Sequence, residues 1–518
     1  MKNYYNEEEK NPNSKAESPL DQESISCTEN SETLDDVFYV PNLEKSITEK
    51  YGIPPEDLSF EKTIPVNHRN VMSALLNEVR PVDFPERALL EQGEQLTNKH
   101  LHVIINDEVQ RIANERRWGL CTHNQEVHIY NGEYWSGIPF EEIKMFLGIA
   151  ALNMGVEPLL ARHYSFMDAL GKQFTASSHL EKPEKKAEEI TINLSNGTFV
   201  INPQERRLRG FQAEDFMIYK LPFCYDADAD AKQFKNYLRE VLPEAQSQMV
   251  LAEFIAYVLI PNRVLALEKA LVLYGDGANG KSVFFSIICA LLGNENVSNY
   301  GLESLTNPSG YHRAKLGSYL LNYASEISPT MNSTIFKQLV SGEPVEARLP
   351  YKEPFVLRDY ARFIFNTNQL PKDVEQNEAF FRRFLLVHFS ITIPEESRDP
   401  NLAKKIISEE LPGIFNWVLE GLDRLLENKN FTKSPSIEYA LEEYKKKSDS
   451  VHLFLEDKGY VISTEKDIFV QSIYLEYKEY CSEFGYKACS LKVFTERLRK
   501  IGFTVHRIAR GNVVNIMK

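Results

Sequence analysis

Near the middle of the chain stands Gly275-Asp276-Gly277-Ala278-Asn279-Gly280-Lys281-Ser282, which fits the pattern G-x-x-x-x-G-K-[ST]. The run of residues 271–274 before it is apolar and short, as in a buried strand. The run of residues 283–292 after it is apolar enough for a packed helix. The glycines therefore lie at a strand-to-helix turn, which is the context that this pattern requires. The alternative is an ordinary glycine-rich turn.

This turn predicts a nucleotide-binding P-loop. Glycines let a backbone curl round a phosphate, and the amide groups and dipole at a helix start favour its negative charge. Lys281 would then reach the β- and γ-phosphates of ATP, and the Ser282 hydroxyl would bind Mg²⁺. All eight residues from Gly275 to Ser282 are candidates for contact with the nucleotide, and we expect ATP and Mg²⁺ as cofactors.

The bulk composition is that of a globular protein, with 43% hydrophobic and 26% charged residues among 518. A chain of this length predicts about three domains. It contains no apolar run of eighteen or more residues and begins with an acidic, polar segment, so we expect neither a membrane span nor a signal peptide. Its six cysteines form no C-x-x-C pair, which argues against a zinc ribbon and favours a reducing cytoplasm.

The net charge of −15 is unevenly distributed. Residues 1–36 hold ten acids against three lysines and few aliphatic side chains, which predicts a disordered tail. Residues 491–518 hold seven basic residues and one acid. For nucleic-acid binding the distribution matters more than the sum, so the basic C-terminal end stays compatible with DNA.

Turn signals and periodicity predict the other elements. Asn131-Gly132 and Asn196-Gly197 each lie between alternating runs and predict hairpins. Helical spacing covers residues 140–154, and residues 231–259 read as two helices joined near Pro243. From about residue 262 short buried strands alternate with helical runs, which predicts a three-layer α/β sheet.

The C-terminal part predicts a connector helix and a winged helix. The connector covers residues 434–444, with Ser434 as its cap. A helix over 491–501 precedes two alternating runs that turn at Arg510-Gly511. The resulting basic surface, a DNA-binding candidate whose alternative is a solvated helix, comprises Lys492, Arg497, Arg499 and Lys500 on the helix and Arg507 and Arg510 on the wing.

The predicted fold class is α/β, with a P-loop ATPase sheet between a mostly helical N-terminal domain and a C-terminal winged helix. The expected regions are an acidic tail over residues 1–60, an α+β domain over 61–261, the ATPase domain over 262–431, and the connector with the winged helix over 432–518.

Two strand ends carry polar candidates. Residues 319–324 read as a strand that Glu326 follows, and a carboxylate there can hold the Mg²⁺ shell or polarise a water. Residues 362–371 read as a strand that ends in amides, of which Asn368 is the first candidate and Asn366 the second for orienting that water. A solvated glutamate and turn-favouring asparagines are the alternatives.

Basic residues mark two further places. Arg382 and Arg383 lie among phenylalanines and need an anionic partner there, either a neighbouring subunit's ATP or a structural salt bridge. Residues 336–355 read as a helix, a Ser-Gly break and a hairpin that turns near residues 350–353, with Arg348 and Lys352 near its tip. In a ring, this tip could contact a phosphate backbone.

The acidic loop Asp226-Ala227-Asp228-Ala229-Asp230 suggests a metal site at first sight. It fails the calcium-loop template because Ala231 stands where glycine is needed and Tyr237 where glutamate is needed. We therefore expect this loop to cap the helix that follows.

The chain resembles the superfamily 3 helicases, in particular their phage, plasmid and poxvirus primase–helicase branch, in the order of five motifs: GDGANGKS, NYASEI, FKQLVSGEPVEARLPYK, FIFNTNQLP and FFRRF. INLSNGTFVI and the helices before residue 271 resemble the domain that precedes the ATPase in that branch. The resemblance covers roughly residues 125–430. It departs from the branch in one respect, because no convincing pair of primase carboxylates precedes it.

The resemblance implies an AAA+ core in a ring, usually a hexamer, that hydrolyses ATP and translocates on DNA. By position, Glu326 would be the acid of the second motif, Asn368 the sensor amide, and Arg383, with Arg382 as alternative, the arginine finger acting in trans. Lys337 and the hairpin with Arg348 and Lys352 fall in the motif used near the DNA channel.

The leading hypothesis is therefore a DNA helicase that replicates a phage, plasmid or other mobile element, with DNA, further copies of itself and other replication proteins as partners. The alternative is an ATP-switched, DNA-binding initiator or defence scaffold without processive unwinding. A small-molecule kinase is disfavoured because it would not need the arginine pair or the winged helix.

Overall fold

The computed structural model describes residues 67–518 apart from 124–125, 180–187, 325–326, 328–330, 351 and 372–373. Every described residue lies in one compact unit. The tail predicted over residues 1–60 lies outside the described residues. Within the described part of the chain, no helix is long and apolar enough to cross a membrane.

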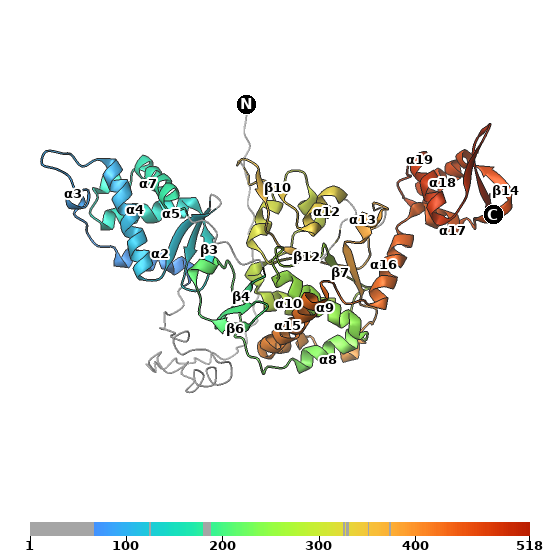
Figure 1. Cartoon of the computed structure of the whole chain (residues 1–518), viewed down its shortest axis with the longest axis horizontal. Helices are drawn as coiled ribbons and strands as arrows, with labels where there is room; N and C mark the ends of the chain where they lie inside the picture. Colours follow the sequence, from blue (N-terminus) through green and yellow to red (C-terminus); the bar gives the residue numbers. More distant parts are fainter. Residues whose placement is uncertain are drawn as a thin grey trace, which may run out of the picture. The chain divides into compact units, whose positions relative to one another are not determined.

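Five parallel strands form the central sheet, in the order β13-β7-β12-β9-β8. Two of them, β7 and β12, are labelled in Figure 1. Their bounds are β7 Ala270–Tyr274, β8 Val297–Ser298, β9 Leu321–Ala324, β12 Arg362–Thr367 and β13 Phe384–His388. All neighbouring pairs in this sheet are parallel, so the carboxyl ends of the strands meet at one edge. The strand predicted before the glycine-rich turn, β7, has β13 and β12 as its neighbours.

Successive side chains of a strand point to opposite faces of the sheet. Because apolar side chains of β7 point to both faces, each face is covered by helices. Leu271 and Leu273 share a core with α10, α9 and α15, whereas Ala270 and Val272 share one with α12, α13 and α16. The bounds are α9 Ala245–Leu259, α10 Lys281–Leu292, α12 Ser333–Ser341, α13 Glu378–Phe381, α15 Leu411–Asn428 and α16 Pro435–Lys447. The predicted mixed α/β arrangement with a parallel sheet is confirmed.

Residues 68–177 pack helices against a small antiparallel sheet in the order β1-β2-β3, around a separate core. Tyr130 pairs with Trp135, which confirms the hairpin predicted at Asn131-Gly132. The elements are α2 His68–Glu78, α3 Phe84–Arg87, α4 Asn98–Glu115, β1 Gly119–His123, β2 Glu126–Tyr130, β3 Trp135–Ile138, α5 Phe140–Asn153, α6 Pro158–Ala161 and α7 Tyr164–Ser177.

A second antiparallel sheet, in the order β4-β5-β6, joins the core of the central sheet. Leu194 pairs with Gly197, as the hairpin prediction requires. The two helices predicted over residues 231–259 are α8 and α9. One core thus spans the predicted boundary at residue 261, although the domain limits themselves stay predictions. The bounds are β4 Ile190–Leu194, β5 Gly197–Ile201, β6 Arg206–Arg209 and α8 Lys232–Val241.

The predicted connector helix, the helix over residues 491–501 and the hairpin are present, and α17, β14 and α18 lie between them. Ser434 caps α16 by accepting a hydrogen bond from the amide of Ile437, and Ile508 pairs with Gly511 at the predicted turn. The unpredicted strand β14 pairs with the other side of β16. The bounds are α17 Ser450–Asp457, β14 Val461–Phe469, α18 Val470–Phe484, α19 Leu491–Ile501, β15 Val505–Ile508 and β16 Gly511–Met517.

The remaining elements are short and connect the layers. They are α11 Leu302–Thr306, α14 Leu402–Glu409, β10 Val345–Ala347, β11 Phe355–Leu357, and the 3₁₀ helices η2 Ala213–Asp215, η3 Asn294–Asn296, η4 Arg313–Ser318 and η5 Glu395–Ser397.

The acidic loop does not cap α8, so that prediction was wrong. Asp230 accepts hydrogen bonds from the amide of Ala231 at 2.8 Å and from Lys235 Nζ at 2.7 Å. Ala231 precedes the helix, so its amide is not one of the first-turn amides that a cap would bind. The amides inside the first turn, those of Gln233 and Phe234, instead donate to the Glu410 carboxylate, both at 2.9 Å. A residue far along the chain thus takes the place of the local cap.

A buried carboxylate ties α9 to the end of α15 and to the segment after it. Glu253 is fully buried and accepts hydrogen bonds from Arg424 Nε at 2.9 Å, the Thr432 amide at 2.8 Å and the Thr432 hydroxyl at 2.6 Å. All its donors lie more than 170 positions further along the chain. This carboxylate therefore joins α9, which precedes the strands of the central sheet in the sequence, to α15, which follows them.

We predict that Glu253→Ala lowers the free energy of unfolding by about 3 kcal/mol, because it leaves the half-buried Arg424 and the half-buried amide of Thr432 without their acceptor. Chemical denaturation of the full chain measures the loss. Glu240→Ala, which removes an exposed glutamate from α8, should change the same free energy by less than about 0.5 kcal/mol. Equal losses in the two variants would contradict the role of Glu253.

Candidate nucleotide-binding loop and nucleic-acid interface

The backbone of the loop between β7 and α10 can be built only with glycine at particular positions. Gly275, Gly277 and Gly280 have φ angles of +151°, +101° and +91°. A Cβ on Gly275 would lie 2.3 Å from the carbonyl oxygen of Phe389, and one on Gly280 would lie 2.8 Å from Val241 Cγ1. The loop is therefore closed tightly against two neighbouring segments.

Three hydrogen bonds from outside fix the shape of the loop. The Asn279 side-chain amide donates to the carbonyl of Phe389 at 2.9 Å, and the amide of Ile393 donates to the carbonyl of Ala278 at 2.9 Å. On the other side, the hydroxyl of Tyr237 in α8 donates to the carbonyl of Gly280 at 2.8 Å. The loop is thus held by residues of α8 and by residues that follow β13. Both sets of residues lie outside the loop motif.

The first turn of α10 presents an open helix N-terminus. Gly280 is its left-handed N-cap residue, and no side chain caps the helix there. The unpaired amides of a first turn carry partial positive charge, which favours an anion. Ser282 in this turn is exposed. The loop and the helix end therefore fit a phosphate group, with a hydroxyl beside it that fits a divalent cation.

Lys281 lies folded into the loop. Its side-chain nitrogen donates to the carbonyl of Gly275 at 2.7 Å and to the side-chain oxygen of Asn279 at 3.0 Å, and the residue is only 7% exposed. Burial lowers the pKa of Lys281, while the nearby charge of Asp276 raises it. A phosphate in the loop would offer this ammonium group a stronger partner than two neutral oxygens.

The amides predicted at the end of β12 lie at the same edge of the sheet as the loop. Thr367 in β12 pairs with Tyr274, the last residue of β7. Asn366 is half-buried and accepts a hydrogen bond from the Tyr323 hydroxyl at 3.2 Å, whereas Asn368 is exposed in the bend that follows. Their predicted roles stay predictions. Glu326, predicted just past β9, lies outside the described residues.

The arginine pair lies at the opposite edge. Both residues directly precede β13, and the carbonyl of Arg383 accepts a hydrogen bond from Ala270, the first residue of β7. The five residues of β7 separate this edge from the glycine-rich loop, a length of about 16 Å. The pair therefore cannot reach the loop of its own chain.

The two arginines differ in their surroundings. The side chain of Arg383 is 8% exposed and donates to the carbonyl of Lys337 at 3.2 Å, to the Ser341 hydroxyl at 2.8 Å and to the carbonyl of Ala379. The side chain of Arg382 is 55% exposed and forms an ion pair of 2.8 Å with Glu268. Arg383 also lies 3.7 Å from Glu268, so both arginines have partners in their own chain, and they differ in that more than half of the Arg382 side chain stays exposed.

The predicted DNA-contacting residues near α12 have different neighbours. Lys337 forms an ion pair of 3.0 Å with Glu375. The hairpin of β10 and β11 is present, and Arg348 donates to the carbonyl of Lys352 at 2.9 Å across its tip, where both residues are exposed. Beneath it, the buried Arg313 donates to the carbonyl of Glu346 at 3.0 Å. The hairpin thus has a fixed base and an exposed basic tip.

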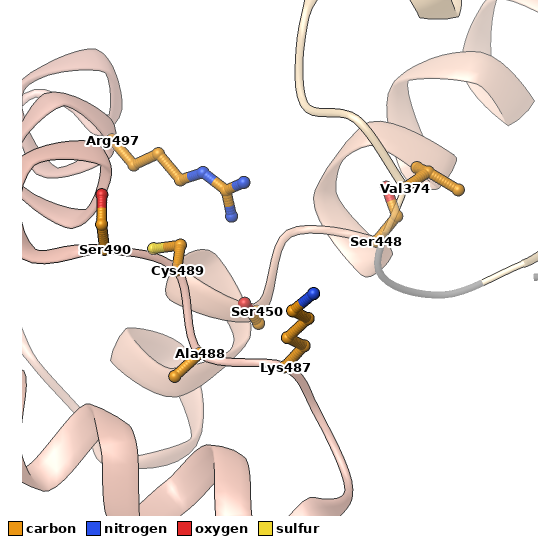
Figure 2. Close-up of a pocket in the computed structure, with 8 residues that line it drawn as sticks. All are labelled: Val374, Ser448, Ser450, Lys487, Ala488, Cys489, Ser490 and Arg497. Carbon is orange, nitrogen blue, oxygen red and sulfur yellow. The ribbon is translucent and has the colours of Figure 1, made fainter. Parts of the chain in front are cut away.

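The basic residues of the C-terminal region are exposed, with one exception. Arg497 forms an ion pair of 3.0 Å with Asp449, and its side chain extends into a cavity of about 330 Å³ beside Lys487 and Ser490 (Figure 2). Arg497 is therefore engaged inside the chain. The exposed members of the predicted surface are Lys492, Arg499, Lys500, Arg507 and Arg510. Their contact with DNA stays a prediction.

Comparison with known proteins gives two family matches. Residues 108–243 match the family described as "D5 N terminal like", and residues 273–383 match a family of unknown function, DUF5906. The first match covers β1 to α8. The second begins inside β7, covers the glycine-rich loop and ends at Arg383.

Individual relatives are distant. A protein of Acanthamoeba polyphaga mimivirus named "Putative helicase" is 22% identical over 292 residues, which is 49% of this chain and 29% of that protein. The chain thus spans less than a third of this relative. Two apo structures of the NrS-1 C-terminal region have TM-scores of 0.45 and 0.41 at 12% identity. Both cover 79% of this chain, and the matches extend over 98% and 97% of those chains.

We predict that Gly275→Ala destabilises the chain by about 3 kcal/mol more than Gly277→Ala, because both add left-handed strain but only the first adds overpacking. Gly277 has nothing within 4 Å of an added Cβ, which makes it the matched control. Chemical denaturation of the two variants measures the difference. Equal destabilisation of the two variants would contradict the close packing of Gly275 against Phe389.

The D5 N-terminal-like match over residues 108–243 and the viral relative named as a putative helicase support the resemblance that the motifs from residue 275 onward predict, and this chain is therefore similar to viral helicase-like proteins.

Proposed function

We propose that this chain is an ATP-dependent DNA helicase that acts in the replication of a phage, plasmid or other mobile element. One observation carries the proposal: the glycine-rich loop and the exposed Arg382 lie at opposite edges of one parallel sheet. A phosphate in the loop needs cations around it as charge develops during hydrolysis. The arginine of the same chain is out of reach, so a second copy supplies it.

The proposed nucleotide is ATP with Mg²⁺, the metal supplying charge neutralisation between the phosphates. The open first turn of α10 binds the phosphates through its amides, and Lys281 leaves the carbonyl of Gly275 to bind them. Ser282 and Glu326 would hold the metal, and Asn368 would orient the attacking water. Among the arginines, the exposure of Arg382 makes it our candidate for the finger, with Arg383 holding α13 in place.

The proposed assembly is an AAA+ ring, with a hexamer as its expected size, in which each ATP lies between two subunits. The exposed tip with Arg348 and Lys352 would move along DNA as the subunits rearrange. The C-terminal region has the order helix, strand, two helices and a hairpin, with exposed cations on α19 and at the hairpin turn, and this order supports the proposed winged helix. Those cations would neutralise phosphates of duplex DNA in a salt-dependent manner.

We predict that Lys281→Ala lowers the rate of ATP hydrolysis by about a hundredfold or more, because the loop loses the cation that reaches the phosphates. The assay is phosphate release with and without single-stranded DNA, together with strand displacement on a forked duplex. Lys404→Ala, which removes an exposed lysine from α14, is the control and should keep both activities.

Full unwinding by Lys281→Ala would overturn the proposed role of the loop. A wild-type chain with DNA-stimulated ATPase activity but no strand displacement would favour the alternative, an ATP-switched initiator or defence scaffold. Absence of ATPase activity in the wild type would overturn both.

We predict that Arg382→Ala lowers ATP hydrolysis by about a thousandfold, as expected for loss of an arginine finger. Mixing Arg382→Ala subunits with Lys281→Ala subunits should restore part of the activity, because some interfaces then combine an intact loop with an intact arginine. Arg383→Ala should instead lower the stability of the chain, since its partners are internal. Failure to restore activity at any mixing ratio would contradict a shared site.

A further inference from the structure

We propose that Tyr237 of α8 is a positioning residue for the bound nucleotide, holding the peptide group between Gly280 and Lys281 in the orientation that phosphate binding needs. This inference rests on the proposed binding of ATP by the glycine-rich loop. It concerns a residue that lies 38 positions before the loop motif begins and inside the region that matches the D5 N-terminal-like family.

The contact itself is well defined. The Tyr237 hydroxyl donates to the carbonyl of Gly280 at 2.8 Å, and the residue is 3% exposed. Burial raises the pKa of Tyr237, so the phenol keeps its proton at neutral pH and acts as a donor. The carbonyl of Gly280 also accepts the amide of Phe284 at 3.1 Å. Tyr237 thus adds a second hydrogen bond to the oxygen that begins α10.

Peptide geometry turns this bond into a constraint on the loop. In a trans peptide unit the carbonyl and the N–H of the next residue lie in one plane and point in opposite directions. Because Tyr237 and Phe284 hold the carbonyl of Gly280 on the helix side, the N–H of Lys281 is directed to the loop side. This amide is among the first-turn donors that a phosphate meets.

The packing around Gly280 keeps α8 in contact with the loop. A Cβ on Gly280 would lie 2.8 Å from Val241 and 3.1 Å from the Tyr237 ring, so only glycine allows this approach. The N-terminal end of α8 is held by Glu410, whose carboxylate accepts hydrogen bonds from the amides of Gln233 and Phe234. The helix is thus fixed at both ends, which lets a single hydroxyl set the orientation of a peptide.

The test is Tyr237→Phe in the full chain, which keeps the ring and removes only the hydroxyl. We expect the Kd for ATP and the KM to rise about fivefold, the effect of one ordinary hydrogen bond, while kcat stays within about twofold of wild type. A purely structural defect would instead lower the folded fraction, which reduces the apparent kcat and leaves the KM unchanged.

Tyr474→Phe is the matched control, because it removes a similar tyrosine-to-carbonyl hydrogen bond, 2.9 Å long, in α18. It should leave the Kd for ATP at the wild-type value. Should Tyr237→Phe not fold, Glu410→Gln tests the same helix from its other end, and a rise in the Kd for ATP is expected there too.

The outcomes separate this inference from the proposed function. Wild-type binding of ATP together with an unchanged Kd in Tyr237→Phe overturns the positioning role alone. An unchanged Kd in a folded Glu410→Gln, when Tyr237→Phe cannot be used, does the same. A wild-type chain that does not bind ATP overturns the proposed function, and the positioning role falls with it.

Discussion

The parallel direction of the five central strands is the constraint on which the rest of the candidate site depends. Parallel strands bring their carboxyl ends to one edge, which gathers the glycine-rich loop and the amides after β12. The same rule sends the residues that precede β13 to the opposite edge. Because helices cover both faces of the sheet, it cannot bend to bring these two edges together. The shared site that we propose therefore requires two copies of the chain.

Much of this arrangement could be predicted from the sequence, because its signals are local. Asn131-Gly132 and Asn196-Gly197 each direct a hairpin through turn chemistry that does not depend on distant residues. Ser434 caps α16 through an amide three positions away. The loop likewise requires glycine because of the backbone angles within its own segment. A short sequence motif is therefore enough to locate it.

The parts that sequence reasoning missed depend on residues that meet only in the folded chain. The acidic loop has the composition of a helix cap, yet Glu410 provides the cap because the α14–α15 junction brings it there. Strand β14 was missed since its pairing partner is the last strand of the chain. Arg382 and Arg383 are identical in type and adjacent, and only packing makes one exposed and the other buried.

The Tyr237 contact changes where the candidate site begins. The loop motif starts at Gly275, but the oxygen that starts α10 is held from α8 by Tyr237. The core that supports the loop also includes β4 and β5, which precede α8. A cut at the predicted boundary of residue 261 would therefore expose the side of the loop that Tyr237 and Val241 cover. On physical grounds the smallest unit that preserves the loop extends from β4 through the central sheet.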